Sequence, residues 1–340
     1  MKTYFLNIFI IISLLSCNSN NATKLNYMYD VIHIKGEPIQ MEQLIGNPYS
    51  IMCVDSLLVY CDFYDGKHLS FFDLKNNRFV GRFLSYGQGP NDALHRVSLI
   101  TYPQKDQLYI YQDGPAKISI LDLLDFQMQT NLQIVSSTPW RPFEVQRTKD
   151  YYIGLGIFDE GSHGVFSIEG ALLYTGGTYP FKGKDMESRD AFLIYQGKFC
   201  TNPDKNYFAS GCVYSDHISF YEVKENEIIL LKEYYSYDAN VEYSNKGGVK
   251  PNDKTTINYS WAFGTASYCY MLFNGKAYAD NNGKTNEGRY IIIFDWHGNY
   301  KKTYYSDYEI RSFCVDETNN YIYATARDDD GDFIIIKLKI

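Results

Sequence analysis

Three histidines and a run of aspartates are the residues of this sequence whose types could bind a metal. His68, His163 and His217 each stand at the start of a short apolar run. Zinc ligands must converge to about 2 Å from one ion, and these runs belong to separate repeats. Residues 328–332 resemble the start of a calcium loop, but the twelfth position, which needs Glu, is Lys339. We therefore expect a hairpin turn at 328–332 and no metal site from either set.

Aromatic and basic residues in polar segments are candidates for ligand binding. Trp140 and Arg141 stand in one such segment, and Tyr259 and Trp261 in another. Arg96 follows a Gly-rich turn and begins an apolar run, which would direct it toward a common centre. Exposed Trp, Tyr and Arg are frequent binding hot spots. The alternative is that each Trp fills a space between sheets.

Cys17 carries a different chemistry. Lys2 precedes an apolar run from Tyr4 to Leu15, and the sequence Leu-Leu-Ser-Cys ends at Cys17. An export signal requires an apolar segment and small residues at the cleavage point. A Cys directly after that point is the lipobox arrangement of bacterial lipoproteins, in which the thiol receives a diacylglycerol. We expect a signal peptide at 1–16, a flexible tether at 17–26, and a membrane anchor at Cys17; an ordinary signal peptide is the alternative.

The remaining cysteines number six: Cys53, Cys61, Cys200, Cys212, Cys269 and Cys314. An exported protein can oxidise such residues, and sequence alone cannot choose among the pairings. A turn after Val54 would place Cys53 opposite Leu58 rather than Cys61, and a turn near Lys205 would place Cys200 near Ser210. We expect buried free thiols that act as small hydrophobic residues.

Six similar runs position these residues. The runs end at Asp73, Asp122, Glu169, Glu222, Asp295 and Lys337. Strand repeats at this spacing are typical of β-propeller blades. We predict an all-β fold at 27–340, a six-bladed propeller of four-stranded antiparallel blades in which each run is a third strand. No helical periodicity of useful length follows the signal peptide.

The two ends of the chain are expected to pair in one blade. The chain stops soon after the sixth run, so the last blade lacks an outer strand, whereas Tyr29 to Ile34 is a spare one. We predict that a strand near 27–40 completes the C-terminal blade and hides its edge. The long fifth interval contains polar segments at 238–256 and 280–288. We interpret these segments as loops of one blade, with a degenerate seventh blade as the alternative.

Composition limits the partners. Asp plus Glu is 40 and Lys plus Arg is 32, a net charge of −8, which argues against nucleic acid. Acidic turns are expected between second and third strands, where Asp is also an ordinary turn residue. They contain Asp65, Asp113, Asp159, Glu160, Asp216, Asp280 and Asp328. This rim could attract basic partners.

A glycine motif follows the first blade. Gly87, Gly89, Pro90 and Asp92 belong to the sequence Gly-Gln-Gly-Pro-Asn-Asp, in which two Gly and a Pro favour a tight, rigid reversal between blades. With the lipobox and six runs, this motif resembles the TolB-like six-bladed propeller lipoproteins of Bacteroidetes over residues 44–340. In those relatives the acid is usually Glu, and here it is Asp92. The resemblance implies an envelope lipoprotein without implying a reaction.

The function expected from these patterns is binding. We predict a lipid-anchored, non-catalytic module for a protein, peptide or glycan of the cell envelope, at the outer membrane and facing the periplasm. The alternative is a metal-dependent hydrolase, lactonase or lyase that uses the channel. Asp62, Asn202, Asn258 and Asp280 could imitate a calcium set of lactonase-type propellers. No Gly-x-Ser-x-Gly elbow occurs, no catalytic residue is assigned and no cofactor is required, calcium remaining the alternative.

Overall fold

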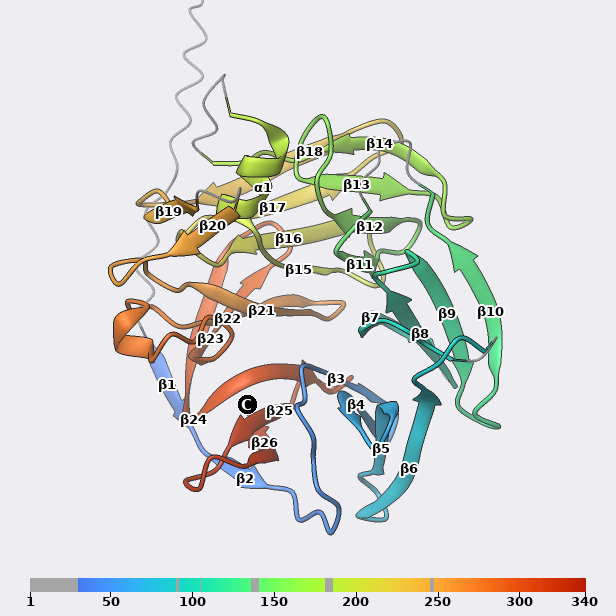
Figure 1. Cartoon of the computed structure of the whole chain (residues 1–340). Helices are drawn as coiled ribbons and strands as arrows, with labels where there is room; N and C mark the ends of the chain where they lie inside the picture. Colours follow the sequence, from blue (N-terminus) through green and yellow to red (C-terminus); the bar gives the residue numbers. More distant parts are fainter. Residues whose placement is uncertain (1–29, 90–91, 105, 136–140, 181–185, 245–247) are drawn as a thin grey trace, which may run out of the picture.

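Antiparallel sheets stand around a central axis in the arrangement of a six-bladed β-propeller (Figure 1). The computed structural model describes residues 30–89, 92–104, 106–135, 141–180, 186–244 and 248–340. In blades one to five the chain runs from an inner strand at the axis to an outer strand at the perimeter. The predicted all-β class and blade number are confirmed.

Blades one to three are separate four-stranded sheets. Blade one contains β3 (Ser50–Val54), β4 (Leu57–Tyr64), β5 (Lys67–Asp73) and β6 (Arg78–Ser85). Blade two contains β7 (Val97–Gln104), β8 (Gln107–Gln112), β9 (Lys117–Asp122) and β10 (Met128–Gln133). Blade three contains β11 (Glu144–Arg147), β12 (Tyr152–Leu155), β13 (His163–Phe166) and β14 (Leu172–Gly176).

Blades five and six are joined, whereas blade four is separate. Blade four contains β15 (Gly197–Thr201), β16 (Tyr207–Cys212), β17 (Ile218–Val223) and β18 (Ile228–Tyr234). Blade five contains β21 (Tyr259–Gly264), β22 (Tyr268–Phe273), β23 (Gly288–Asp295) and the first part of β24 (Tyr300–Val315). Blade six contains the rest of β24, then β25 (Tyr321–Arg327), β26 (Phe333–Lys339) and β2 (Gly36–Pro38).

The six apolar runs are the third strands of the blades, as predicted. A third strand is paired on both sides, and its two faces pack against neighbouring blades. Strand β5, for example, is buried at five consecutive positions from His68 to Phe72. A strand covered on both faces is apolar almost continuously rather than at alternate positions, which is why the runs are visible in the sequence.

The ring closes through the N-terminal segment. β2 pairs antiparallel with β26, with Gly36 opposite Leu338, and so supplies the missing outer strand of blade six. The expected closing strand near 27–40 is therefore confirmed. The spare strand at its start behaves differently from the expectation, because β1 (Val31–Ile34) pairs parallel with β24 in blade five. The N-terminal segment thus holds two blades together.

The apolar interior is divided between blades. The described residues form five hydrophobic clusters, and each contains side chains of neighbouring blades. The largest joins blades five, six and one, and includes Phe313, Ile293 and Leu58. This arrangement leaves the axis itself to the inner strands and the turns at their ends.

Two insertions stand beside blade four. Helix α1 (Ser188–Tyr195) precedes β15, and a separate hairpin of β19 (Val241–Ser244) and β20 (Gly248–Pro251) precedes β21. The sequence has no helical periodicity of useful length after the signal, and the structure adds one helix of 8 residues there, which is fixed by packing. Its Ala191 and Phe192 are buried in a cluster to which Val249 of the hairpin also belongs. A short 3-10 helix, η1 (Ala279–Asn281), occupies the 280–288 segment. Neither described helix is long and apolar enough to cross a membrane.

The six described cysteines are free, as expected. The register places Cys53 opposite Leu58 as predicted, but Cys200 lies opposite Ala209 and not Ser210, a shift of one residue. One contact between two sulfur atoms joins blades four and five: Cys200 Sγ lies 3.5 Å from Cys269 Sγ.

Candidate functional site

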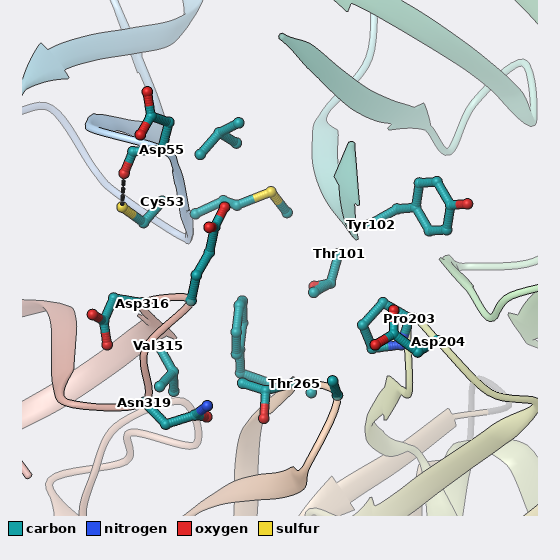
Figure 2. Close-up of a pocket in the computed structure, with 16 residues that line it drawn as sticks. Cys53, Asp55, Thr101, Tyr102, Pro203, Asp204, Thr265, Val315, Asp316 and Asn319 are labelled. Carbon is teal, nitrogen blue, oxygen red and sulfur yellow. Dashed lines mark hydrogen bonds between the residues drawn. The ribbon is translucent and has the colours of Figure 1, made fainter. Parts of the chain in front are cut away.

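The main candidate site is a cavity of about 570 Å³ where the inner strands end. Figure 2 shows side chains from several blades around this hollow. We call it the wide mouth, and its lining comes from the ends of β3, β15, β21 and β24 and from the β7 strand. Its lining is Met52, Cys53, Val54, Asp55, Thr101, Tyr102, Pro203, Asp204, Phe263, Gly264, Thr265, Ala266, Val315, Asp316, Glu317 and Asn319. The volume lies within the range of roughly 300–1,000 Å³ usual for small-molecule pockets.

The wall of the wide mouth is apolar and its rim is acidic. Met52, Phe263 and Val315 are buried strand residues of three blades. Asp55 and Asp316 follow the last residues of β3 and β24, so their carboxylates lie where the strands give way to turns. The wide mouth therefore combines an apolar surface with negative charge.

The carboxylate of Asp316 is fixed by its own turn. It accepts hydrogen bonds from the backbone amides of Asn320 and Tyr321, both at 2.8 Å, and from the Thr318 hydroxyl. The neighbouring Asn319 carboxamide oxygen accepts a hydrogen bond from the Tyr270 hydroxyl at 3.1 Å. The rim is thus preorganised on the blade-six side.

Cys53 reports the electrostatics of this cavity. Burial raises the pKa of its thiol to about 12, and the negative charges of Asp316, Glu317 and Asp55 act in the same direction. The thiol donates a hydrogen bond to the Asp55 carbonyl oxygen at 3.4 Å (Figure 2). A protonated thiol is a weak nucleophile, so Cys53 is a wall residue rather than a reactive group.

Behind Tyr102 lies a cation. The Arg147 guanidinium carbon is 3.9 Å from the centre of the Tyr102 ring and also lies over Tyr109 and Tyr152, at 5.2 and 5.4 Å. Three ring faces stabilise this charge, and Arg147 forms no ion pair with a carboxylate among the described residues. The packing holds Tyr102, and with it the blade-two side of the wide mouth, in place.

A second, smaller pocket of about 80 Å³ lies where the inner strands begin. We call it the narrow mouth, and it contains two of the predicted binding residues, Arg96 and Trp261. Arg96 stacks over Tyr49, with 4.1 Å from its guanidinium carbon to the ring centre. Lys198 pairs with Glu144 at 2.6 Å and lies 5.6 Å from the Trp261 ring centre. This mouth combines aromatic rings with two cations and with the carboxylates of Glu144 and Asp113, and it is largely filled by its own contacts.

Two further predicted binding residues, Tyr259 and Arg141, do not line the narrow mouth. Tyr259 belongs to β21 and is fully buried against blade four, so it is a packing residue and not a loop residue. Trp261 also lies in this strand, and its indole nitrogen donates to the Phe313 carbonyl at 2.8 Å. Arg141 is exposed and donates to the carbonyl oxygen of Gly114. Cys17, Pro90 and Trp140 lie outside the described residues.

The described residues of the glycine motif contact one another. The Asp92 carboxylate accepts a hydrogen bond from the Gly89 amide at 3.0 Å. A Cβ atom on Gly87 or Gly89 would lie 2.5 or 2.7 Å from that carboxylate, closer than atoms pack. A side chain at either position would displace the Asp92 carboxylate from its hydrogen bond to Gly89. The two glycines therefore allow the Asp92 contact in the segment between blades one and two.

Three residues of the candidate calcium set form hydrogen bonds with other protein groups, and the fourth is exposed. Asp62 accepts a hydrogen bond from the Ser70 hydroxyl at 3.0 Å, and Asn258 accepts one from the Tyr237 hydroxyl at 2.6 Å. Asn202 donates to the Ala266 carbonyl, and Asp280 is exposed in η1. The described chain contains no group of three or more His, Cys, Asp or Glu side chains arranged to hold a metal ion.

The sequence patterns did not predict the wide mouth, because the candidate binding residues pointed to the opposite rim. A signal for it exists: Met52-Cys-Val-Asp55 and Phe313-Cys-Val-Asp316 repeat the same pattern at the ends of two inner strands. The repeat indicates equivalent positions in the first and last blades, and these blades are neighbours once the ring closes. Asp55 and Asp316 therefore had to lie at one mouth.

The fold and its channel define a six-bladed propeller with a wide acidic mouth and a narrow mouth of mixed charge. A family model, TolB-like 6-blade propeller-like, matches residues 30–318. The chain therefore belongs to this family, as the resemblance implied.

Solved structures share the fold at low sequence identity. A protein of Bacteroides fragilis NCTC 9343 that is described as exported is 13% identical to this chain. Its structure aligns with a TM-score of 0.54, and the alignment covers 90% of this chain and 94% of that one. A duf4221-family protein of Bacteroides vulgatus is 11% identical with a TM-score of 0.55, covering 91% and 97%. The calcium-binding protein regucalcin of Agrobacterium tumefaciens is 12% identical with a TM-score of 0.51, covering 91% and 96%. A comparison with curated protein sequences gave no significant match.

Proposed function

We propose that this protein is a lipid-anchored propeller of the cell envelope that binds a protein, peptide or glycan without chemical conversion. The observation that carries the proposal is the wide mouth, a preformed cavity of about 570 Å³ with an apolar wall and polar rim. Ligand sites in proteins have this composition and size. Its lining comes from several blades, so the ring closure that holds the fold also shapes the site.

The chemistry of the lining supports binding rather than catalysis. A nucleophilic mechanism needs a nucleophile within hydrogen-bond reach of a base. Among the residues that line the wide mouth, the thiol of Cys53 is held protonated and has no histidine beside it. The Asp316 carboxylate is occupied by three donors of its own turn.

The location in the envelope is supported by the N-terminal sequence. The apolar run and Leu-Leu-Ser-Cys17 match an export signal with a lipidated cysteine. A fold relative from Bacteroides fragilis is itself assigned as exported. We place the protein at the outer membrane, facing the periplasm, with the propeller held on the tether after Cys17.

A photo-crosslinking experiment tests the proposal. A benzophenone amino acid at Ala266, an exposed residue of the wide mouth, should trap a discrete partner in cells of the source organism. The same amino acid at Leu124, a 76% exposed residue of blade two outside this cavity, is the control. Equal crosslinking at both positions, or none at Ala266, would refute binding at the wide mouth.

A further inference from the structure

We propose that the wide mouth recognises a cationic segment of a partner polypeptide, in which lysine or arginine alternates with apolar side chains. This inference rests on the proposed function, because it specifies the ligand of the same cavity. Two observations carry it together: the distribution of charge around the cavity and the apolar wall beneath that charge.

The charge of the rim is negative, and the described residues supply no cation to balance it. Asp55, Asp204, Asp316 and Glu317 line the cavity from blades one, four and six. In the part of the chain that the structure describes, no Lys, Arg or His nitrogen lies within 4.0 Å of these four carboxylates. Carboxylates without a cationic partner create a field that attracts cations into a recess with low-dielectric walls.

The spacing of the carboxylates favours an extended ligand over a point charge. They come from different blades and do not converge on one ion position, since the described residues contain no metal-holding group of three. Figure 2 shows Asp55 and Asp316 on one side of the hollow and Asp204 across from them. A ligand that reaches both sides must carry more than one positive charge.

The apolar wall selects the kind of cation. Met52, Val54, Phe263 and Val315 present carbon surface below the acidic rim. Lysine and arginine have this dual character, because their aliphatic stems pack on apolar surface while their charged heads stay at a polar edge. Apolar residues between the cations would occupy the remaining floor of a cavity of about 570 Å³.

The opposite mouth differs in charge. Arg96 and Lys198 lie at the narrow mouth together with Asp113 and Glu144, and Lys198 pairs with Glu144. Cations and carboxylates are therefore balanced at the narrow mouth, whereas the charged residues that line the wide mouth are all acidic. An acidic peptide would be repelled from the larger cavity, so charge sets which segment enters it.

Fluorescence anisotropy with the purified full-length protein tests the inference. The probe is a short labelled peptide that alternates lysine and leucine. Peptides of the same length that alternate glutamate with leucine, or lysine with serine, separate the contributions of charge and apolar surface. We expect the lysine–leucine peptide to bind at least about tenfold more tightly than either, and its affinity to fall as salt is added.

Matched variants locate the effect. Asp55→Asn, Asp204→Asn and Glu317→Gln together neutralise three exposed rim carboxylates and should weaken the lysine–leucine peptide about tenfold. Asparagine accepts the left-handed backbone of Asp55, whose φ is 52°. The control combines Asp65→Asn, Asp125→Asn and Glu225→Gln, which remove equal charge at exposed positions outside the cavity and should leave the affinity unchanged.

The outcomes distinguish this inference from the proposed function. Equal affinity for the glutamate–leucine peptide, equal weakening by both triple variants, or no binding of any peptide would overturn the cationic segment. Displacement by spermidine at the same affinity as the peptide would replace the polypeptide by a small organic cation. If crosslinking at Ala266 succeeds while these peptides fail, the proposed function stands and only the ligand class falls.

Discussion

His163 is the buried ionisable residue with the clearest consequence for stability. Its ring lies between blades three and four, 4.8 Å from the Phe208 ring centre, and Nδ1 contacts the Ser162 hydroxyl at 2.8 Å. Its Nε2 has no partner among the described residues. Burial lowers the pKa of His163 to about 3, because the surroundings cannot solvate an imidazolium.

Stability should therefore fall as acid is added. The unfolded chain takes up the His163 proton near pH 6.5, whereas the folded chain takes it up only near 3. Between these values the unfolded state binds more protons than the folded state. As the pH falls, this residue therefore lowers the free energy of unfolding by up to about 1.4 kcal/mol for each pH unit. Urea unfolding between pH 6.5 and 5 measures the slope, and the upper part of the window limits interference from carboxylates.

Variants separate this histidine from the others. His163→Gln should flatten the slope over that interval whatever it does to absolute stability. His297→Gln, at an exposed position, should retain the slope because His163 remains. An unchanged slope in His163→Gln would show that the buried ring is not the source.

Residue types alone predicted the binding residues unevenly. Arg96 and Trp261 were expected near the channel, and the structure places both at one pocket. Tyr259, two positions from Trp261, packs between blades four and five, whereas Trp261 packs against the cluster of blades five, six and one. The pairing of β21 with β22 shifts register between these two residues, so they do not share a face of the strand. The wide mouth depends on residues that ring closure brings together, so the repeat that ends at Asp55 and Asp316 indicates the site only once the first and last blades are known to be neighbours.

At the scale of elements, the closing strand β2 rests on a close approach at Gly36. A Cβ atom there would lie 2.8 Å from the Tyr308 ring and 2.9 Å from the Ile336 side chain. Gly36→Val should therefore weaken the packing of the closing strand, lowering the free energy of unfolding by about 1–3 kcal/mol, the usual cost of overpacking. Urea denaturation followed by tyrosine fluorescence measures the change.

The hairpin β19–β20 supplies the control. A Cβ atom on Gly248 of β20 meets nothing within 4 Å. Gly248→Val should leave stability nearly unchanged, since valine suits a strand and has room there. Equal effects of the two substitutions would mean that closure at Gly36 contributes little to the stability of the ring.

Elements were predictable where they repeat. Third strands are covered on both faces, so their apolar runs are continuous and their order along the chain reveals the blades. Helix α1 was not predictable, because its last residues Phe-Leu-Ile-Tyr resemble a strand and its burial depends on a hairpin some fifty residues later. The division of the N-terminal segment into β1 and β2, on two different blades, likewise follows from the closed ring.

At the scale of the whole molecule, the proposed anchor determines where the wide mouth can meet a partner. The tether after Cys17 is polar and lacks an acidic run, so we expect the propeller to face the periplasm. One acyl chain alone binds membranes weakly, whereas the diacylglycerol on a lipobox cysteine supplies two chains and makes attachment stable. Attachment keeps the cavity close to the membrane surface and raises the local concentration of envelope partners.

Cys17→Ser should abolish this attachment. Cells fed an alkyne fatty acid should label the wild-type chain and not the variant, and the variant should move from the membrane to the soluble fraction. Cys53→Ser removes a partly exposed thiol of the propeller and should keep both the label and the membrane location, because only the lipobox cysteine is acylated. Protease added to intact cells should digest the wild-type chain only after the outer membrane is opened. Label retained in Cys17→Ser would disprove the anchor, and digestion in intact cells would place the propeller on the cell surface.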